Sequence, residues 1–262
     1  MRWYRPPHSE DSPIGPVLLW LHGGGFFRGS LDQPEAHAVA ESLAQNGVTV
    51  VTADYRLCPP PGMPWAPARK GRARGRYPLP LDDVMTAYHE LRSRSSRGVL
   101  LGGASAGACL AAAATLRASD EGAHAAGTVL AYGFFHAVHP RRTDSRARSR
   151  GLRRLSHATW ALDLANRNYA GPGHMLADRL AFPGGHRIDG FSRTLVVNAE
   201  HDNMRVSGDQ FADELGAIGV NLQHHVLAGT RHAFLNSPDT QPFRDAIALI
   251  AAWSFGTTTR PV

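Results

Sequence analysis

The chain has 262 residues, of which 43% are hydrophobic and 19% charged, and its formal net charge at pH 7 is +6. This composition is that of a globular protein and excludes a disordered or fibrous chain, while the length suits one α/β domain built around a single sheet. Only Lys70 among the 28 basic residues is a lysine, and no nucleic-acid-binding motif accompanies the positive charge, so we expect no nucleic-acid partner.

The N-terminal residues and the cysteines indicate the cellular compartment of the protein. Met1 to Pro7 carry charge but no apolar run of the kind that a secretory signal requires. No apolar stretch of the sequence reaches the length of a membrane span. Cys58 and Cys109 are too few for a disulfide framework and lack metal-ligand spacing. We therefore expect a cytoplasmic protein with two reduced thiols, no membrane partner and no metal ion.

Short apolar runs rich in Val and Leu alternate with segments of helical period, which is typical of parallel strands joined by helices. Most runs are continuous, as in strands that are buried on both faces of a sheet. The expected strands are Val17–Leu21, Val48–Ala53, Val99–Leu101, Thr128–Tyr132, Thr194–Asn198 and Leu222–Leu227. The expected helices are Ala36–Leu43, Leu81–Leu91, Ala106–Arg117, Ser156–Tyr169, Arg205–Ile218 and Pro242–Trp253. This order predicts the α/β class, with a mostly parallel, doubly wound sheet and helices on both faces.

Two stretches interrupt the alternation. Cys58 to Tyr77 is rich in Pro, Gly and Arg, has no periodicity, and is interpreted as a long surface loop. His136 to Arg193 separates two expected strands by far more residues than one crossover helix needs. Runs of arginine within residues 69–76 and 141–154 are typical of solvated loops.

The segment His22-Gly23-Gly24-Gly25 directly follows the first expected strand. Three successive glycines let the chain turn back and leave backbone N–H groups that can face a developing oxyanion. A flexible turn is the plain alternative. A phosphate-binding loop would require G-x-x-x-x-G-K-[ST] or G-x-G-x-x-G, and neither pattern follows. His22 is interpreted as a structural side chain that hydrogen-bonds the loop backbone.

The segment Gly103-Ala104-Ser105-Ala106-Gly107 lies between an expected strand and an alanine-rich helix. In this context a G-x-S-x-G sequence places the serine on a tight turn, and its glycines keep neighbouring backbone clear of the nucleophile. The same letters occur often by chance, and a turn of small residues that only allows close packing is the alternative. The strand before and the helix after favour a nucleophile at Ser105.

A serine nucleophile requires a base, and the base requires an acid that orients it. Among the 14 histidines, His232 follows the last expected strand and precedes the last helix, so it lies where the active-site crevice of an open α/β sheet forms. Glu200 and Asp202 both follow the strand before that one. We favour Asp202 because it lies further into the loop, and Glu200 stays the alternative. The order Ser, Asp, His is that of α/β hydrolases.

Together these motifs resemble the hormone-sensitive-lipase-like branch of the α/β hydrolases, a family of carboxylesterases and lipases. The matching segments are His22-Gly23-Gly24-Gly25-Phe26, Asp54-Tyr55-Arg56-Leu57, Pro80-Leu81-Asp82-Asp83, Gly103 to Gly107, Asp202 with Arg205, and His232 with Phe234. The resemblance implies that the backbone N–H groups of Gly24, Gly25 and Ala106 form the oxyanion hole. It gives the same triad, and it implies a single domain over residues 1–262 in which 136–193 forms a cap or insert.

The chain departs from the family's pattern at several positions. Ala104 stands where the family usually has Asp, and Ala108 and Ala233 stand where it usually has Gly. We expect Ala104 to remove a polar contact near the nucleophile and to alter substrate preference. Family members also carry several dozen residues before the oxyanion strand, which here begins at about residue 17. The expectation is therefore a reduced cap and a more open site.

The residues and the resemblance together predict a serine hydrolase that cleaves carboxylic esters with a short acyl group and needs no cofactor. An amidase or formamidase, or a tailoring enzyme for a lactone or thioester in secondary metabolism, would use the same groups and stays open. A non-catalytic, ligand-binding member is less favoured, because such members tend to lose the histidine. The expected partner is a small ester, and the sequence leaves a homodimer open.

Overall fold

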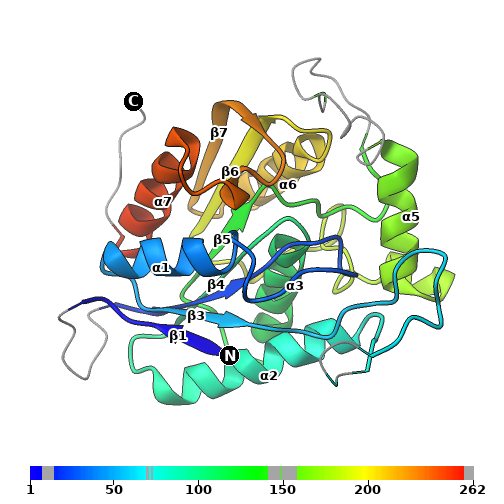
Figure 1. Cartoon of the computed structure of the whole chain (residues 1–262), viewed down its shortest axis with the longest axis horizontal. Helices are drawn as coiled ribbons and strands as arrows, with labels where there is room; N and C mark the ends of the chain where they lie inside the picture. Colours follow the sequence, from blue (N-terminus) through cyan, green and yellow to red (C-terminus); the bar gives the residue numbers. More distant parts are fainter. Residues whose placement is uncertain (8–14, 69–70, 72, 141–147, 149–157, 257–262) are drawn as a thin grey trace.

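A computed structural model describes residues 1–7, 15–68, 71, 73–140, 148 and 158–256. Its centre is a seven-stranded sheet with helices packed on both faces (Figure 1). Most of the arginine run at 141–154, part of the run at 69–76, and the first two residues of the helix expected from Ser156 lie outside the described residues.

The strands follow the order β1-β3-β2-β4-β5-β6-β7 across the sheet, and every neighbouring pair from β3 to β7 is parallel. The strands are β1 (Arg2–Tyr4), β2 (Val17–Leu21), β3 (Val50–Ala53), β4 (Val99–Ala104), β5 (Gly127–Ala131), β6 (Thr194–His201) and β7 (Leu222–Arg231). Parallel strands need crossover connections, which is why helices separate them along the chain. The expected α/β class and parallel, doubly wound sheet are confirmed.

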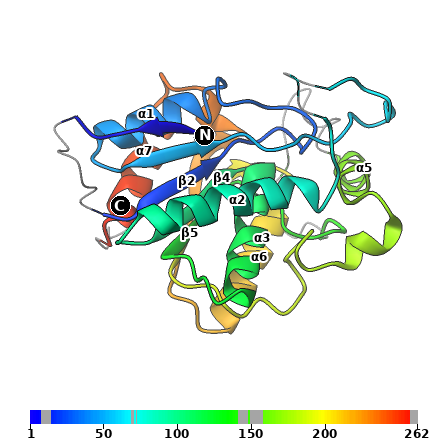
Figure 2. The ribbon, with the colours of Figure 1, turned by 90° about the horizontal axis from the view of Figure 1, so that it is seen from below.

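The helices divide between the two faces of the sheet (Figure 2). The helices are α1 (His37–Gln45), α2 (Leu79–Arg94), α3 (Ala106–Asp120), α5 (Thr159–Ala170), α6 (Arg205–Ala217) and α7 (Gln241–Ser254), with short 3-10 turns η2 (Gly173–Ala177) and η3 (Phe234–Asn236). Buried residues of α1 and α7 form one core with one face of the sheet, and those of α2, α3 and α6 form a second core with the other. The continuous apolar runs follow from this arrangement: in β2, Leu19 belongs to one core and Trp20 to the other.

Several boundaries differ from the expected ones. β4, β6 and β7 continue to Ala104, His201 and Arg231, because their backbone ladders extend past the apolar runs into glycine and polar residues. The expected strand Thr128–Tyr132 ends one residue earlier, since Tyr132 has a positive φ of 37° and leaves the ladder. All three extended strands end close to residues of the candidate site.

The strand β1 was not expected from the sequence. Its three residues pair antiparallel with β3 at the edge of the sheet, with Trp3 opposite Val51. Three residues that are half-buried or exposed give no apolar period, so the sequence carries no strand signal there. In the described part of the chain, no helix is both long and apolar enough to cross a membrane.

Candidate active site

Ser105 lies on a strained turn between β4 and α3. Its backbone has φ 54° and ψ −118°, a conformation that non-glycine residues rarely adopt. The flanking glycines are required by the packing: a Cβ on Gly107 would lie 2.3 Å from the Leu21 carbonyl oxygen, and one on Gly103 would lie 2.5 Å from the Gly107 backbone. The sharp turn projects the Ser105 side chain from the carboxyl end of the central strand.

Asp202 and His232 meet Ser105 from the ends of β6 and β7, which pair with each other and are separated from β4 by β5. The Ser105 Oγ lies 3.0 Å from His232 Nε2, and His232 Nδ1 lies 2.5 Å from Asp202 Oδ2. The second oxygen of Asp202 accepts the Met204 amide at 3.0 Å, which fixes the carboxylate, and Asp202 is fully buried. Glu200, the alternative acid, instead accepts a hydrogen bond from the Gly229 amide. The structure therefore brings together Ser105, His232 and Asp202.

The oxyanion loop, defined here as residues 22–29, connects β2 to α1 beside the serine. Gly24 and Gly25 line the same pocket as Ser105, and both have positive φ, 126° and 61°. Within the described residues, the N–H groups of Gly24, Gly25 and Ala106 donate to no protein acceptor. Three uncommitted amides beside a serine hydroxyl are suited to bind a negative oxygen.

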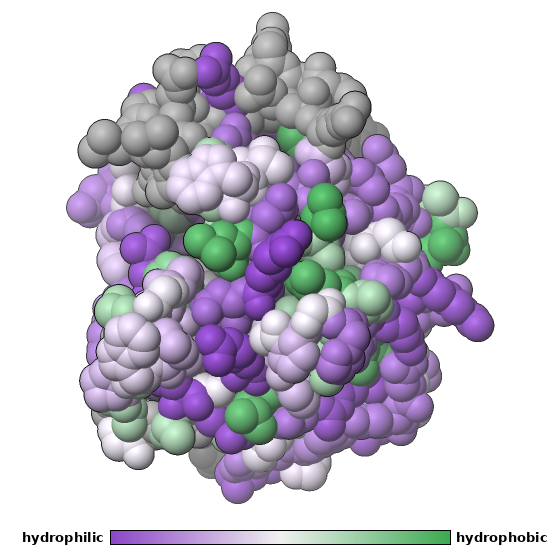
Figure 3. Space-filling view, turned by 90° about the vertical axis from the view of Figure 1, so that its right-hand side faces the viewer, coloured by the Kyte–Doolittle hydropathy of each residue, from purple (hydrophilic) through white to green (hydrophobic). Residues whose placement is uncertain are grey.

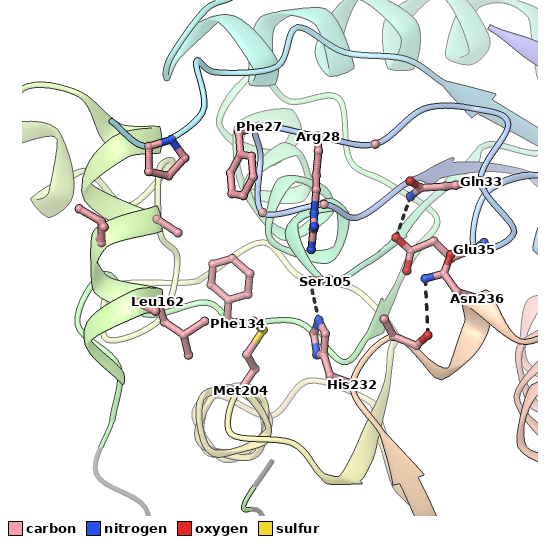
Figure 4. Close-up of a pocket in the computed structure, with 18 residues that line it drawn as sticks. Phe27, Arg28, Gln33, Glu35, Ser105, Phe134, Leu162, Met204, His232 and Asn236 are labelled. Atoms are coloured by element: carbon pink, nitrogen blue, oxygen red, sulfur yellow. Dashed lines mark hydrogen bonds between the residues drawn. The ribbon is translucent and has the colours of Figure 1, made fainter. Parts of the chain in front are cut away.

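A pocket of about 610 Å³ opens onto the serine (Figure 4). One wall is apolar and includes Phe27, Phe134 and residues of α5 such as Leu162. The opposite wall is polar and carries Gln33, Glu35 and Asn236. Figure 3 shows the side of the molecule on which α5 lies, where apolar side chains form small separate patches among hydrophilic ones in the described residues.

Comparison with known proteins identifies the family. Residues 18–236 match the alpha/beta hydrolase fold family. The chain belongs to this family. It is 29% identical over 245 residues to an ethyl acetate hydrolase of Pseudomonas putida, which covers 90% of this chain and 71% of that enzyme. It is 32% identical over 127 residues to esterase LipI of Mycobacterium tuberculosis, which covers 46% of this chain and only 35% of that protein.

The fold of this hydrolase is also that of solved esterase structures. An esterase from Pyrobaculum calidifontis superposes with a TM-score of 0.81 at 26% identity, covering 97% of this chain and 79% of that one. The expected resemblance to carboxylesterases of the α/β-hydrolase fold is confirmed by these matches. The match reaches past β7 and therefore includes every residue of the site described above.

Glu35 is a buried carboxylate that no sequence motif marked as a site residue. It is 4% exposed, and it accepts hydrogen bonds from the Gly23 amide at 3.0 Å, from Gln33 at 2.7 Å and from the Tyr132 hydroxyl at 3.0 Å. The Tyr132 ring in turn packs edge-on against the ring of His232, with centroids 5.2 Å apart. Glu35 thus connects the oxyanion loop to the histidine of the hydrolase.

Ala104, the residue before the nucleophile, brings no polar side chain to the turn at Ser105. Its side chain is fully buried in the apolar core, so no polar group stands at the position before the serine. A Cβ on Gly23 would lie 2.6 Å from Glu35 Oε1 and 2.9 Å from the Ala104 carbonyl oxygen, which places Glu35 close to the same turn. A carboxylate is therefore present near the nucleophile, supplied from the segment before α1.

His22 supports the loop and does not reach the serine. Its Nδ1 lies 2.8 Å from the Gly23 carbonyl oxygen and its ring stacks on Tyr55, whose hydroxyl donates to the His22 carbonyl at 2.7 Å. Next along the chain, Arg56 makes a bidentate pair with Asp83, at 2.9 Å for both hydrogen bonds. The ion pair thus joins two segments that resemble the family, residues 54–57 and 80–83, and the first of them also holds His22 of the oxyanion loop.

A second serine, histidine and carboxylate lie together away from the pocket. His136 Nδ1 lies 2.8 Å from the Ser207 Oγ, and His136 Nε2 lies 3.0 Å from Glu214. Ser207 is fully buried, and its oxygen already accepts the Phe135 amide at 2.8 Å. Glu214 also accepts the Gly185 amide. This cluster ties the chain around residues 136 and 185 to α6 and offers no accessible nucleophile.

The two cysteines are free, buried thiols. Burial raises the pKa of Cys58 to about 12, and it also raises the pKa of Cys109. Both therefore stay protonated and unreactive in the folded hydrolase at neutral pH. Among the described residues, no group of three metal-ligating side chains could hold an ion. The expected cytoplasmic location stays a prediction, and the sequence leaves a homodimer open.

Proposed function

We propose that this protein hydrolyses carboxylic esters through an acyl-enzyme on Ser105, with His232 as the base and Asp202 as the acid that orients it. The hydrogen-bonded chain from Ser105 Oγ to His232 and on to Asp202, inside a pocket that also holds uncommitted amides, carries the proposal. The esterase names of the relatives support it.

In the first half-reaction, the Ser105 oxygen attacks the ester carbonyl while His232 Nε2 takes the hydroxyl proton. The bond to the leaving alcohol breaks, and His232 returns the proton to that alcohol. In the second half, His232 takes a proton from water, the hydroxide attacks the acyl-enzyme, and Ser105 is released with its proton restored. Asp202 keeps Nδ1 protonated throughout, so that Nε2 is the nitrogen that faces the serine.

The negative oxygen that forms at each attack is held by the amides of Gly24, Gly25 and Ala106. The support for this assignment is that the two glycines line the pocket and that all three N–H groups lack a protein acceptor in the described part of the chain. Backbone amides fixed before the reaction stabilise such an oxygen strongly because they need no reorganisation.

A short acyl group is proposed for the substrate, and α5 is proposed to act as the cap. Residues Ala161, Leu162 and Ala165 of this helix face the pocket and complete its apolar wall. A volume of about 610 Å³ lies within the usual range for small-molecule sites and must hold both the acyl and the alcohol part. Rates across a series of p-nitrophenyl esters, from acetate to decanoate, test this part of the proposal, and a maximum at long chains would contradict it.

The triad is tested by replacing its members one at a time. With p-nitrophenyl butyrate, Ser105→Ala should lower kcat on the order of 10⁴-fold or more, and Asp202→Asn about 10³-fold or more. Glu200→Gln is the matched control for the acid and should change kcat by less than about tenfold. Wild-type turnover in Ser105→Ala would end the proposal, and a larger loss in Glu200→Gln than in Asp202→Asn would transfer the role of the acid to Glu200.

A further inference from the structure

Arg28 projects from the oxyanion loop into the pocket. Its backbone amide donates to the Gly24 carbonyl at 3.1 Å, so a tight turn within the loop fixes where the side chain starts. The side chain lines the pocket together with Ser105 and points toward the serine, between the apolar and the polar wall (Figure 4). Any substrate bound with its carbonyl at the loop would therefore lie beside this guanidinium.

Among the residues that the structure describes, no carboxylate neutralises the charge of Arg28. Other arginines, such as Arg56 with Asp83 and Arg179 with Asp120, form ion pairs at 2.6–2.9 Å. For Arg28, no carboxylate in the described ranges lies within salt-bridge distance, and its side-chain contact is with the Phe27 ring, 5.7 Å from the centroid. A guanidinium without a carboxylate partner can donate hydrogen bonds to a planar anion such as a carboxylate.

The acidic groups nearby do not compete for Arg28. Glu35 is the one carboxylate among the described residues that line the pocket, and both of its oxygens already accept hydrogen bonds from Gly23, Gln33 and Tyr132. Asp202 is fully buried and hydrogen-bonded to His232.

A second guanidinium adds positive charge next to the oxyanion loop. Arg74 donates hydrogen bonds to the backbone carbonyls of Phe27, within the loop, and of Cys58.

We propose that Arg28 selects esters that carry a carboxylate close to the scissile bond. The substrate's carboxylate would accept hydrogen bonds from the guanidinium while the ester carbonyl occupies the oxyanion loop. This inference rests on the proposed ester hydrolysis and adds to it a substrate class: half-esters of diacids or esters of hydroxy acids, in place of neutral alkyl esters.

Two pairs of substrates of matched shape test the preference. In the first pair, monoethyl succinate carries a carboxylate in its acyl part, and ethyl levulinate carries a neutral methyl ketone at the same position. In the second pair, acetoxyacetate carries the carboxylate in its alcohol part, and acetoxyacetone carries the methyl ketone there. For at least one pair, kcat/KM of the wild-type enzyme should favour the anion by about tenfold or more, as expected for a charge-assisted hydrogen bond that is partly exposed to water. The pair that shows the preference identifies the side on which the charge binds.

Arg28→Gln tests whether the arginine causes the preference. In this variant, the ratio of kcat/KM for the favoured anion to kcat/KM for its neutral counterpart should fall by about tenfold or more, while Arg28→Lys should keep part of the preference. Arg92→Gln, which removes an exposed arginine on α2, is the control for net charge and should keep the preference intact. Raising the salt concentration should weaken the wild-type preference.

The outcomes separate this inference from the proposed function. Hydrolysis of the neutral esters with no preference in either pair, or equal losses on both members of a pair in Arg28→Gln, would overturn the role of Arg28 and leave the esterase proposal standing. No hydrolysis of any of the four esters by the folded wild-type enzyme would contradict the ester hydrolysis itself.

Discussion

The carboxylate of Glu35 accepts a hydrogen bond of 3.0 Å from the backbone amide of Gly23, the first glycine of the oxyanion loop. Its other oxygen accepts from Tyr132, whose ring packs against His232. The backbone of the same residue is also held, because its carbonyl accepts from the buried Trp20 indole at 2.8 Å. One residue therefore positions both the loop that binds the oxyanion and the ring of the base, without touching the reacting atoms.

Replacement of Glu35 by Gln should lower kcat about tenfold or more with p-nitrophenyl butyrate and change KM little, because the amide cannot accept from all three donors and the loop loses its fixed geometry. Glu35→Asp, which keeps the charge, should recover part of the loss. The unfolding midpoint of each variant shows whether a loss of kcat comes from misplaced groups in the site or from a less stable fold. A rise in KM with unchanged kcat would show that Glu35 acts on binding and not on the geometry of the loop.

Gly107 should not tolerate a side chain. Its Cβ would lie 2.3 Å from the Leu21 carbonyl oxygen and 2.5 Å from that of His22, both backbone atoms that cannot move aside. Gly107→Ala is expected to destabilise the protein by roughly 3 kcal/mol or more, measured by denaturant unfolding. Gly216 on α6 meets nothing within 4 Å and is the control, since Gly216→Ala should stabilise by about 0.5–1 kcal/mol through helix propensity. Equal effects at the two sites would contradict the packing described for the turn at Ser105.

Ala233, directly after His232, should be improved by glycine. Its φ of 60° and ψ of 34° lie in the left-handed region, which disfavours a residue with a Cβ. Ala233→Gly should therefore raise the free energy of unfolding by up to about 1 kcal/mol, reduced by the greater freedom of glycine in the unfolded chain. Thermal unfolding measures the change, and esterase activity should be retained. A loss of stability above about 1 kcal/mol would show that the Ala233 methyl group packs favourably.

The stability of the protein should fall in acid, in part through Glu214. Burial alone would raise the pKa of this carboxyl, but hydrogen bonds from His136, the Gly185 amide and Gln210 hold it below its usual value of 4.5. Because the folded-state pKa is the lower one, the stabilisation is fully present above the unfolded-state pKa and is lost as the pH falls through the folded-state pKa. Glu214→Gln should flatten the fall in unfolding free energy below about pH 5, whereas Asp213→Asn, at an exposed neighbour, serves as control. An unchanged acid slope in Glu214→Gln would contradict this role.

Local signals in the sequence were enough to predict most of the sheet and the groups that meet in the site. Continuous apolar runs mark strands buried on both faces, and the strand, turn and helix around Ser105 follow from a glycine pattern that the packing of Gly103 and Gly107 requires. His232 and Asp202 could be selected because parallel strands end at one edge of the sheet. Their hydrogen bond joins residues 30 positions apart and became visible only in three dimensions.

Other features left no local trace. β1 is held by pairing with the edge of β3 and has no apolar period of its own. Glu35 lies in a segment where a glutamate would ordinarily be solvated, and its burial depends on donors from Gly23 and from the distant Tyr132. Arg28 is one arginine among many in the sequence, and its open position in the pocket follows only from the fold of the oxyanion loop.

Identification of the residue that a fluorophosphonate modifies in the native enzyme tests whether Ser105 is the nucleophile. Peptide mass spectrometry after reaction should find one adduct, on Ser105, because only this serine is hydrogen-bonded to a histidine inside the pocket within the described residues. Ser105→Ala should abolish labelling, and Ser207→Ala should keep the adduct on Ser105. An adduct on any other residue, or no labelling of folded protein that still hydrolyses p-nitrophenyl butyrate, would show that Ser105 is not the nucleophile.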